Sequence, residues 1–234
     1  MKVLITGTSS GIGAGLAKEY LKKNHQVWGI SRRRNDALLK NDRYMHLAQD
    51  ITEFTYCALN TANFLAGTKT LDLVVLNAGT LNNIKDMRNT SVEELQETMN
   101  ANVWGNKTVL DAALNMCEVK QVVAISSGAA VHATRGWNAY AISKAALKMM
   151  TELYAEENED THFSSVAPGL VDTDMQEYLT GLDEEEKFPV IKKLKDARGT
   201  DKMPDPEEVA EKLVETFEKV REEESGSFVD IRKY

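Results

Sequence analysis

Residues 2–23 of the chain read KVLITGTSSGIGAGLAKEYLKK, which is a short apolar run, a glycine-rich turn and an amphipathic segment in direct succession. The apolar run is typical of a buried β-strand. The segment after the turn repeats apolar side chains at Ile12, Leu16, Ala17 and Tyr20, which is the spacing of a helix face. A strand that passes through a glycine turn into a helix is the opening unit of a parallel βαβ fold.

The same alternation of apolar runs and amphipathic segments continues to the end of the chain. It predicts an α/β fold with a doubly wound, predominantly parallel sheet (a Rossmann fold), in a single domain over residues 1–234. Residues 170–205 fit no strand, and we expect a substrate-loop insertion there, either a functional lid or a disordered loop. Strands are predicted at residues 2–6, 26–31, 44–48, 71–77, 119–126, 161–167 and 228–231, and helices at residues 11–23, 52–65, 90–115, 137–157 and 206–221.

The composition is that of an acidic globular protein, with 234 residues and a formal net charge of −8. Arg32, Arg33 and Arg34 form the one basic cluster, which is too short to follow a nucleic-acid backbone. Cys57 and Cys117 show no metal-binding spacing. No apolar run approaches the roughly 18 residues of a membrane helix. We therefore expect a cytoplasmic protein with no metal, nucleic-acid or membrane partner.

The turn between the first strand and the first helix has the character of an anion-binding site. Glycine allows backbone conformations that other residues disfavour, and the start of a helix presents unpaired N–H groups with a partial positive charge. The turn would hold a dinucleotide pyrophosphate, although its spacing, G-x-x-x-G-x-G, differs from the G-x-G-x-x-G fingerprint and an ordinary tight turn is the alternative. The expected binding residues are Gly7, Ser9, Ser10, Gly11, Ile12 and Gly13.

The residues at the end of the second strand indicate which dinucleotide is bound. Enzymes that use NAD place a carboxylate about 20 residues past the glycines, where it binds the ribose hydroxyls. This chain has Ser31, Arg32 and Arg33 there instead. A hydroxyl and guanidinium groups bind a phosphate dianion, which a carboxylate would repel. The sequence therefore predicts NADP(H), with solvated loop arginines as the alternative.

Tyr140 and Lys144 lie four residues apart in a predicted helix and hence on one face of it. A nearby ammonium favours phenolate over phenol, so we expect Lys144 to lower the pKa of Tyr140 toward neutrality. Tyr140 is then a candidate general acid for the reduction of a carbonyl group. Such pairs also occur by chance on helix surfaces, and a surface pair is the alternative.

The order of motifs along the chain resembles that of the short-chain dehydrogenase/reductase family over essentially the whole length. Within that family, the segments SRRRND, GWNAYAISK, APGLVDTDMQ and FVDIRKY are similar to the sepiapterin reductase and benzil reductase group. Each motif alone would fit a turn or a strand end, but their joint agreement is specific. The motifs are TGTSSGIG at the start, Asp50-Ile51, Asn77-Ala78-Gly79, Asn102, Ser126-Ser127, YAISK, and Pro168-Gly169 with Thr173.

The resemblance implies a role for each matching residue. Tyr140 would donate the proton, and Lys144 would lower its pKa and bind the nicotinamide ribose. Ser127, thirteen residues before Tyr140, would bind the substrate carbonyl, with Ser126 one residue out of register. Asn102 would hold a water of the proton relay by bending its helix. The implied cofactor contacts are Asp50, Ile51, Asn77, Ala78, Gly79, Tyr140, Lys144, Pro168, Gly169, Val171 and Thr173.

Other residues near the expected pocket have either a substrate role or a structural one. Asp230 lies where similar reductases carry an acid that anchors an amino-bearing substrate, and a turn-forming aspartate is the alternative. Trp137 would form a wall of the pocket or pack at the start of its helix. His132 is expected to be an exposed loop residue. The insertion would contribute the lining residues Met175, Gln176 and Tyr178.

The function predicted from these residues is hydride transfer from NADPH to a small ketone or diketone, with Tyr140 as proton donor. A non-catalytic NADPH-binding regulatory or scaffold protein is the alternative, and the proton-relay residues argue against it. A nucleotide-sugar epimerase or dehydratase is disfavoured because the chain is too short for a separate substrate domain. Relatives commonly pair through two long helices, here residues 90–115 and 137–157, which implies a homodimer or homotetramer. The fold does not select one carbonyl substrate.

Overall fold

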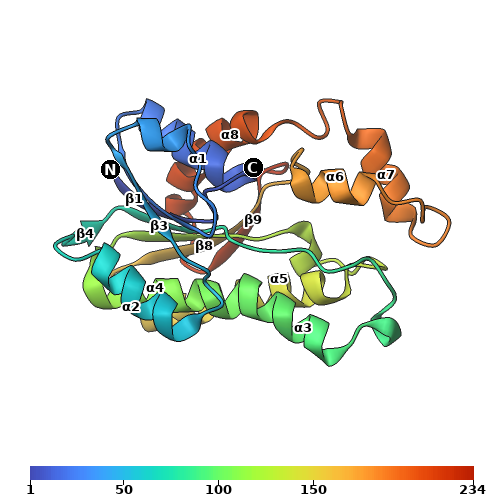
Figure 1. The fold of residues 1–234 in the computed structure, drawn as a ribbon, viewed down its shortest axis with the longest axis horizontal. Coiled ribbons are helices and arrows are strands. Elements are labelled where there is room, and N and C mark those ends of the chain that lie inside the picture. The colour runs from blue at the N-terminus through green and yellow to red at the C-terminus, as the bar shows by residue number, and fades with distance from the viewer.

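The computed structural model describes residues 1–234 and centres on one sheet that lies between two layers of helices (Figure 1). All neighbouring strands in this sheet are parallel, as the alternation of elements predicts. The strands are β1 (Lys2–Thr6), β2 (Gln26–Ser31), β3 (Tyr44–Ala48), β4 (Thr70–Leu71), β5 (Leu73–Leu76), β6 (Glu118–Val119), β7 (Gln121–Ile125), β8 (His162–Ala167) and β9 (Ser227–Asp230).

The strand order in the seven-stranded sheet is β3-β2-β1-β5-β7-β8-β9, and β4 pairs with β6 in a second, two-stranded sheet. Successive strands are added in one direction from β1 to β3 and in the other direction from β5 onward. In open α/β sheets, ligands bind outside the carboxyl ends of the strands at such a switch point. The topology confirms the predicted doubly wound, single-domain Rossmann fold.

Helices cover both faces of the sheet. They are α1 (Gly11–Lys22), α2 (Phe54–Phe64), α3 (Val92–Met99), α4 (Gly105–Met116), α5 (Asn138–Glu157), α6 (Asp174–Thr180), α7 (Pro189–Ala197) and α8 (Pro206–Lys219). Helices α1 and α8 lie on one face, and α2, α4 and α5 lie on the other, with α6 and α7 beyond one edge of the sheet (Figure 1). None of these helices combines the length and the apolar character that crossing a lipid bilayer requires.

Two apolar clusters join the helix layers to the sheet. Val3 and Ile5 of β1 pack toward α1 and α8, whereas Leu4 packs toward α2, α4 and α5. Successive residues of a strand point to opposite faces, so a run that is apolar at every position is buried on both sides. All three side chains are fully buried. This double burial holds the carboxyl end of β1 in a fixed position at the centre of the sheet.

Two strands that the sequence predicts as single runs are each broken in two. Residues 71–77 divide into β4 and β5 at Asp72, and residues 119–126 divide into β6 and β7 at Lys120. The Asp72 carboxylate accepts hydrogen bonds from the Lys2 backbone N–H and from Lys120 Nζ, each at 2.8 Å. The prediction of uninterrupted strands is wrong here because Asp72 and Lys120 interact just before β5 and β7 begin, while β4 and β6 pair with each other in the second sheet.

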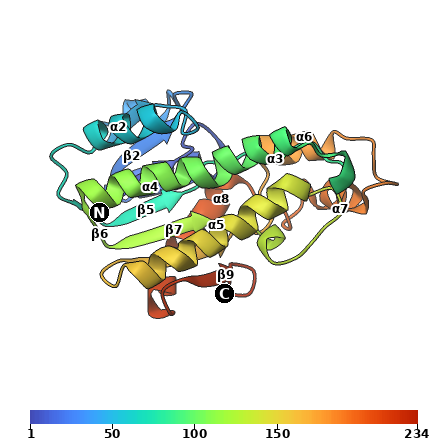
Figure 2. The ribbon, with the colours of Figure 1, turned by 90° about the horizontal axis from the view of Figure 1, so that it is seen from below.

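The helix predicted over residues 90–115 begins as expected but is irregular in its middle. Ser91 caps α3 through a capping box with Glu94. Between α3 and α4 the chain forms a π-helical turn, Asn100–Trp104. The two helices and the turn form one long rod that runs alongside α5 (Figure 2). Such turns are frequent at functional sites, and this one contains Asn102.

The insertion contains no strand, as predicted, but it is ordered into α6 and α7. These helices have an apolar cluster of their own, which includes Leu179, Phe188 and Ile191. The same cluster contains Ile84, from the loop after β5, and packs against Trp137. The alternative of a disordered loop is therefore wrong, because the segment buries enough apolar surface to order itself against the rest of the domain.

Candidate active site

A single cleft of about 490 Å³ lies at the carboxyl ends of the strands, around the switch point between β1 and β5. Its lining contains most of the residues that the sequence analysis singled out. These are Gly7, Ser9, Ser10, Gly11, Ile12, Ser31, Arg32, Arg33, Asp50, Ile51, Asn77, Ala78, Gly79, Ser127, Tyr140, Lys144, Pro168, Gly169, Val171, Thr173, Met175 and Gln176. Ser126, which the motif comparison placed one residue out of register, also lines the cleft, and the lining residues that the sequence analysis missed are Ile30, Gln49, Thr52, Thr80, Ala101, Ile125 and Asp174.

Five predicted site residues lie outside the cleft lining, and each has a structural contact that explains its position. Gly13 lies in α1, where a Cβ atom would approach the Gly7 carbonyl oxygen to 2.2 Å. Asn102 lies behind Gly79, and Trp137 lies behind Tyr140 with their ring centroids 5.4 Å apart. Tyr178 and Asp230 are hydrogen-bonded to other parts of the protein, as described below.

The glycine turn forms a cradle that fits a pyrophosphate. Gly7 and Gly11 have φ angles of 78° and 58°, which favour glycine. Ser10, at the N-cap of α1, makes no side-chain hydrogen bond to the helix. The first N–H groups of α1 have no intrahelical acceptors and lie at the cleft, where a helix start attracts anions.

Thr6 joins the turn to the end of β5. Its Oγ1 accepts hydrogen bonds from the backbone N–H groups of Asn77 and Ala78, each at 2.9 Å, and donates to Asn106 Oδ1 at 2.8 Å. The Asn77 side chain donates in return to the Thr6 carbonyl at 2.9 Å. Thr6 and Asn106 were missed by the sequence analysis because their partners lie some 70 to 100 residues away in sequence. They hold the two strand ends that form the floor of the cleft.

Arg32 and Arg33 line the end of the cleft next to β2, and Arg32 forms an ion pair with Asp50 there. Arg32 Nη1 lies 3.8 Å from Asp50 Oδ2, and the Arg32 side chain is 77% exposed. Burial acts to raise the pKa of Asp50, but hydrogen bonds from Thr52 and the Arg32 charge outweigh it and lower that pKa. Ser31 Oγ donates to the Arg33 carbonyl at 2.9 Å and lies 3.0 Å from His46 Nε2. The guanidinium groups, rather than the serine hydroxyl, are free to turn toward a ligand.

Burial, rather than Lys144, determines the direction in which the pKa of Tyr140 is shifted in the structure. Burial raises the pKa of the Tyr140 phenol, with the Ser127 side chain acting in the opposite direction. Burial also lowers the pKa of Lys144 to about 8. The sequence-based expectation of an acidified tyrosine is wrong for the protein alone, because desolvation disfavours the charged form of each group. Lys144 Nζ lies 5.7 Å from the Tyr140 ring centroid and donates to the Ile125 carbonyl at 2.7 Å.

Lys144 and its surroundings fit the ribose of a nicotinamide nucleotide. An ammonium has three N–H donors, and one of those on Lys144 is used by Ile125. Lys144 is 4% exposed and lines the cleft, so its other donors are available to a ligand bound there. Ser126 Oγ, which is also buried at the cleft, has no hydrogen-bond partner in the protein. These unpaired polar atoms match the hydroxyl groups of a sugar.

Asn102 is fully buried in the π-helical turn and links three parts of the site. Its Oδ1 accepts from the Thr80 N–H at 2.6 Å, and its Nδ2 donates to the Thr80 carbonyl at 3.0 Å and to Ser143 Oγ at 2.8 Å. A Cβ atom on Gly79 would lie 3.1 Å from Asn102 Oδ1 and 3.8 Å from Lys144 Nζ. The side chain therefore fixes the loop after β5 against α5, while its part in a water relay stays a prediction.

Asp230 is held by Arg232 rather than presented to the cleft. Arg232 donates to the carboxylate through Nε at 2.9 Å and through Nη2 at 2.5 Å. This bidentate pair lowers the pKa of Asp230. The Arg232 side chain also passes the Gly169 position, 3.2 Å from where a Cβ atom would stand. His132 is exposed, as expected for a loop residue.

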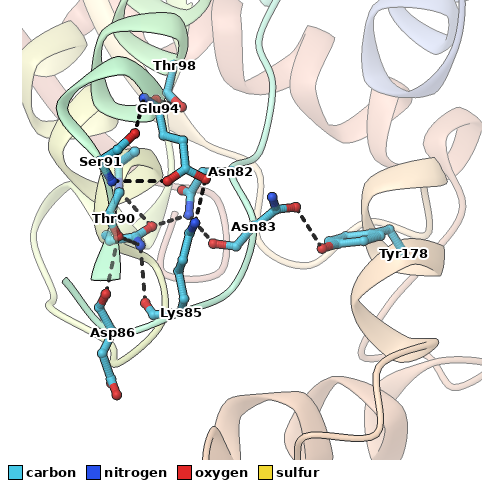
Figure 3. A network of polar contacts seen from close by, with 11 residues as sticks. Asn82, Asn83, Lys85, Asp86, Thr90, Ser91, Glu94, Thr98 and Tyr178 are labelled. Atoms are coloured by element: carbon cyan, nitrogen blue, oxygen red, sulfur yellow. Dashed lines mark hydrogen bonds and ion pairs between the residues drawn. The ribbon is translucent and has the colours of Figure 1, made fainter. Parts of the chain in front are cut away.

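The loop after β5 carries a polar network that faces the insertion (Figure 3). Lys85 Nζ and Glu94 Oε1 form an ion pair at 2.6 Å, and Asn82 Oδ1 accepts from the Tyr140 backbone N–H at 2.8 Å. Tyr178 of α6 points toward this loop, and its hydroxyl donates to Asn83 Oδ1 at 3.2 Å. The loop thus connects the start of the Tyr140 helix to the insertion.

A parallel sheet with its ligand cleft at the switch point is typical of α/β enzymes that bind a dinucleotide. The family model described as short chain dehydrogenase matches residues 1–182, and the chain belongs to this family. The protein is therefore an oxidoreductase of a family that uses a nicotinamide cofactor. The resemblance found in the motifs is confirmed.

Individual relatives agree with this assignment. An uncharacterized oxidoreductase of Schizosaccharomyces pombe is 35% identical over 181 residues, which cover 74% of this chain and 72% of the relative. A benzil reductase ((S)-benzoin forming) of Bacillus subtilis is 28% identical over 99% of this chain and 98% of its own length. The crystal structure of a short chain dehydrogenase/reductase from Saccharomyces cerevisiae matches with a TM-score of 0.86 at 24% identity, covering 98% and 95% of the two chains.

Proposed function

We propose that the protein reduces a ketone or diketone with NADPH and that Tyr140 donates the proton to the new alcohol. The observation that carries the proposal is that one cleft joins the glycine cradle to Tyr140, Lys144 and Ser127. A phenol whose pKa is raised by burial stays protonated at neutral pH, as a proton donor must. The similarity to a benzil reductase supports a carbonyl substrate.

Each residue of the proposed mechanism acts through its own charge or hydrogen bonds. The bound nicotinamide supplies the hydride. Ser127 Oγ lines the cleft and holds the substrate carbonyl oxygen beside the Tyr140 hydroxyl, which stabilises the negative charge that develops there. Lys144 holds the nucleotide ribose, and its positive charge favours loss of the Tyr140 proton to the substrate oxygen. Asn102 positions Tyr140 and Lys144 through its hydrogen bonds to Thr80, in the loop after β5, and to Ser143 of α5.

The phenol is tested by Tyr140→Phe, which removes the donor and keeps the ring. We expect turnover of a carbonyl substrate to fall by about 10²-fold or more, because general acid catalysis contributes on that order. The dissociation constant for NADPH, measured by nucleotide fluorescence, should change little. A Tyr140→Phe enzyme with full activity would refute the mechanism, and absence of NADPH oxidation by the wild type across a panel of ketones would refute the activity.

The preference for NADPH is proposed to come from Arg32 and Arg33, which bind the phosphate on the adenosine ribose. Arg32 can exchange its long contact with Asp50 for a charge-assisted contact with phosphate. Arg32→Ala should weaken NADPH binding by about tenfold while NADH binding changes little. Equal loss for both nucleotides, or a wild type that binds them equally, would contradict the proposed preference.

We further propose a homodimer or homotetramer that pairs through the two long helical segments, residues 90–115 (α3, the π-helical turn and α4) and residues 137–157 (α5). The π-helical turn and α5 expose the apolar residues Trp104, Ile142, Met149 and Leu153, which are 43%, 45%, 54% and 54% exposed. The last three share one face of α5 at helical spacing. Light scattering should give the mass of an oligomer, and the substitution of Met149 by Lys should shift it toward the monomer. The cytoplasmic location and the substrate role of Asp230 stay predictions.

A further inference from the structure

His46 lies next to the residues that are proposed to bind the phosphate of NADPH, but it does not line the cleft itself. It belongs to β3, the edge strand beside β2, and is half-buried. Its Nε2 lies 3.0 Å from Ser31 Oγ, at the end of β2. Ser31 lines the cleft together with Arg32 and Arg33, and these three residues form the arginine turn. The imidazole therefore contacts the arginine turn from outside the cleft.

The hydrogen bonds of Ser31 determine which atom of His46 carries a proton. A serine hydroxyl has one proton to donate and two lone pairs that accept. Ser31 Oγ lies 2.9 Å from the Arg33 carbonyl oxygen, which can only accept, so the Ser31 proton is used there. His46 Nε2 must then be the donor to Ser31 Oγ. Burial lowers the pKa of His46, and the charge of Arg34 acts in the same direction, so the imidazole is neutral near pH 7 with its proton on Nε2.

A second side chain of β3 reaches Ser31 through Thr8. Tyr44 Oη lies 2.8 Å from Thr8 Oγ1, which lies 3.4 Å from Ser31 Oγ. The Tyr44 and His46 rings are stacked, with their centroids 6.2 Å apart. Gly29 leaves room for these contacts, because a Cβ atom there would lie 2.3 Å from Tyr44 Oη and 2.6 Å from Thr8 Oγ1. The Ser31 hydroxyl is therefore surrounded by protein partners and has no free proton for a phosphate.

The bonds of Ser31 hold the turn that carries the arginines. Its donation to the Arg33 carbonyl closes the chain around Arg32. Two residues further on, the Asn35 side chain donates to the Ser9 carbonyl in the glycine turn at 3.2 Å. The arginines thus lie between two anchored points of the backbone. A binding group that is held in place before its ligand arrives loses less conformational entropy on binding.

We propose that His46 is a positioning residue for the recognition of NADPH. Its donation to Ser31 keeps the Ser31 proton on the Arg33 carbonyl, and this holds the arginine turn in the form that binds the phosphate on the adenosine ribose. NADH lacks that phosphate, so its binding does not depend on the turn. The inference rests on the proposed preference for NADPH and deepens it, because it assigns part of that preference to a residue of β3 outside the cleft.

The test compares the dissociation constants of NADPH and NADH, measured by nucleotide fluorescence. His46→Leu keeps an apolar side chain in the same place and removes the donor. We expect NADPH binding to weaken about fivefold, the usual effect of losing one neutral hydrogen bond, while NADH binding changes little. His46→Gln keeps an N–H donor that can reach Ser31, and it should restore most of the wild-type selectivity.

Met45→Ala is the matched control, since Met45 is the neighbouring residue of β3 and packs into the apolar cluster on the other face of the sheet. It should weaken the packing of β3 and leave the ratio of the two dissociation constants at the wild-type value. In a chain that carries Arg32→Ala and Arg33→Ala, added His46→Leu should cause no further loss of NADPH binding, because no arginine is left to position.

Three results would overturn the role of His46 and leave the proposed preference for NADPH intact. An equal loss for NADPH and NADH in His46→Leu would mean that the residue acts on the packing of β3. A His46→Gln chain as defective as His46→Leu would mean that the donor does not matter. A further loss in the chain without the two arginines would mean that the imidazole acts on the phosphate directly. If the wild type binds NADPH and NADH equally, the proposed preference itself fails, and this assignment fails with it.

Discussion

Replacement of Lys144 by Met should stabilise the protein in the absence of nucleotide. Burial lowers the pKa of Lys144 from 10.5 to about 8, and the side chain is 4% exposed. At about 1.4 kcal/mol per pKa unit, keeping Lys144 charged near neutral pH costs the folded protein about 3 kcal/mol. Loss of the hydrogen bond to the Ile125 carbonyl offsets about 1 kcal/mol of the gain. The net increase in unfolding free energy is then about 2 kcal/mol.

The pH dependence of the unfolding free energy shows whether the buried charge of Lys144 causes the difference between the variant and the wild type. The pKa of Lys144 is lower in the folded chain than in the unfolded chain, so between about pH 8 and 10.5 the unfolded state binds more protons. The unfolding free energy of the wild type therefore rises with pH between about pH 8 and 10.5, and that of Lys144→Met does not. The advantage of the variant should be largest near pH 7 and should disappear by about pH 10.

Thermal unfolding measured by circular dichroism provides the assay. For a chain of this size, about 2 kcal/mol corresponds to an increase in Tm of about 4–8 °C. Lys148→Met is the control, one turn further along α5, where the ammonium binds Glu152 on a part-exposed surface. It should change stability by less than about 0.5 kcal/mol at every pH.

Nucleotide should reverse the order of stabilities, since Lys144 is proposed to hold the ribose. Excess NADPH is expected to raise the Tm of the wild type more than that of Lys144→Met. A Lys144→Met protein that is less stable than the wild type near neutral pH, or whose difference from it does not vary with pH, would show that the buried ammonium carries no such cost.

Three further predictions concern the scaffold of the site. Gly13→Ala should destabilise the protein by about 1–3 kcal/mol in urea unfolding, because its Cβ would approach the Gly7 carbonyl oxygen to 2.2 Å; unchanged stability would show that this contact relaxes freely. Thr6→Val should cost about 3 kcal/mol, since it leaves buried backbone N–H groups without an acceptor, and a loss below about 1 kcal/mol would contradict that reasoning. Ser91→Ala should cost about 1 kcal/mol by removing the cap of α3, and an equally stable variant would mean that Glu94 alone suffices to hold the helix start.

The sequence by itself determined the order of the seven strands of the main sheet, the helices that connect them and the position of the cleft. Apolar periodicity located the strands, as at residues 2–6, and the Ser91 cap located the start of a helix. The carboxyl ends of parallel strands all lie at the same end of the sheet. Motifs that directly follow different strands must therefore lie close together there. The glycine turn, Tyr140 and Lys144 line one cleft for this reason. Strand periodicity, helix caps and glycine turns each depend on residues that are close in the sequence, so the sequence alone is enough to predict them.

The tertiary structure alone decided the electrostatics and the partners of these groups. The pKa of Tyr140 is raised rather than lowered, because burial of the phenol disfavours its charged form. Asp230 binds Arg232, and Gln176 is buried without a partner for its oxygen. Burial and pairing depend on which distant segments pack together, and a one-dimensional pattern does not carry that information.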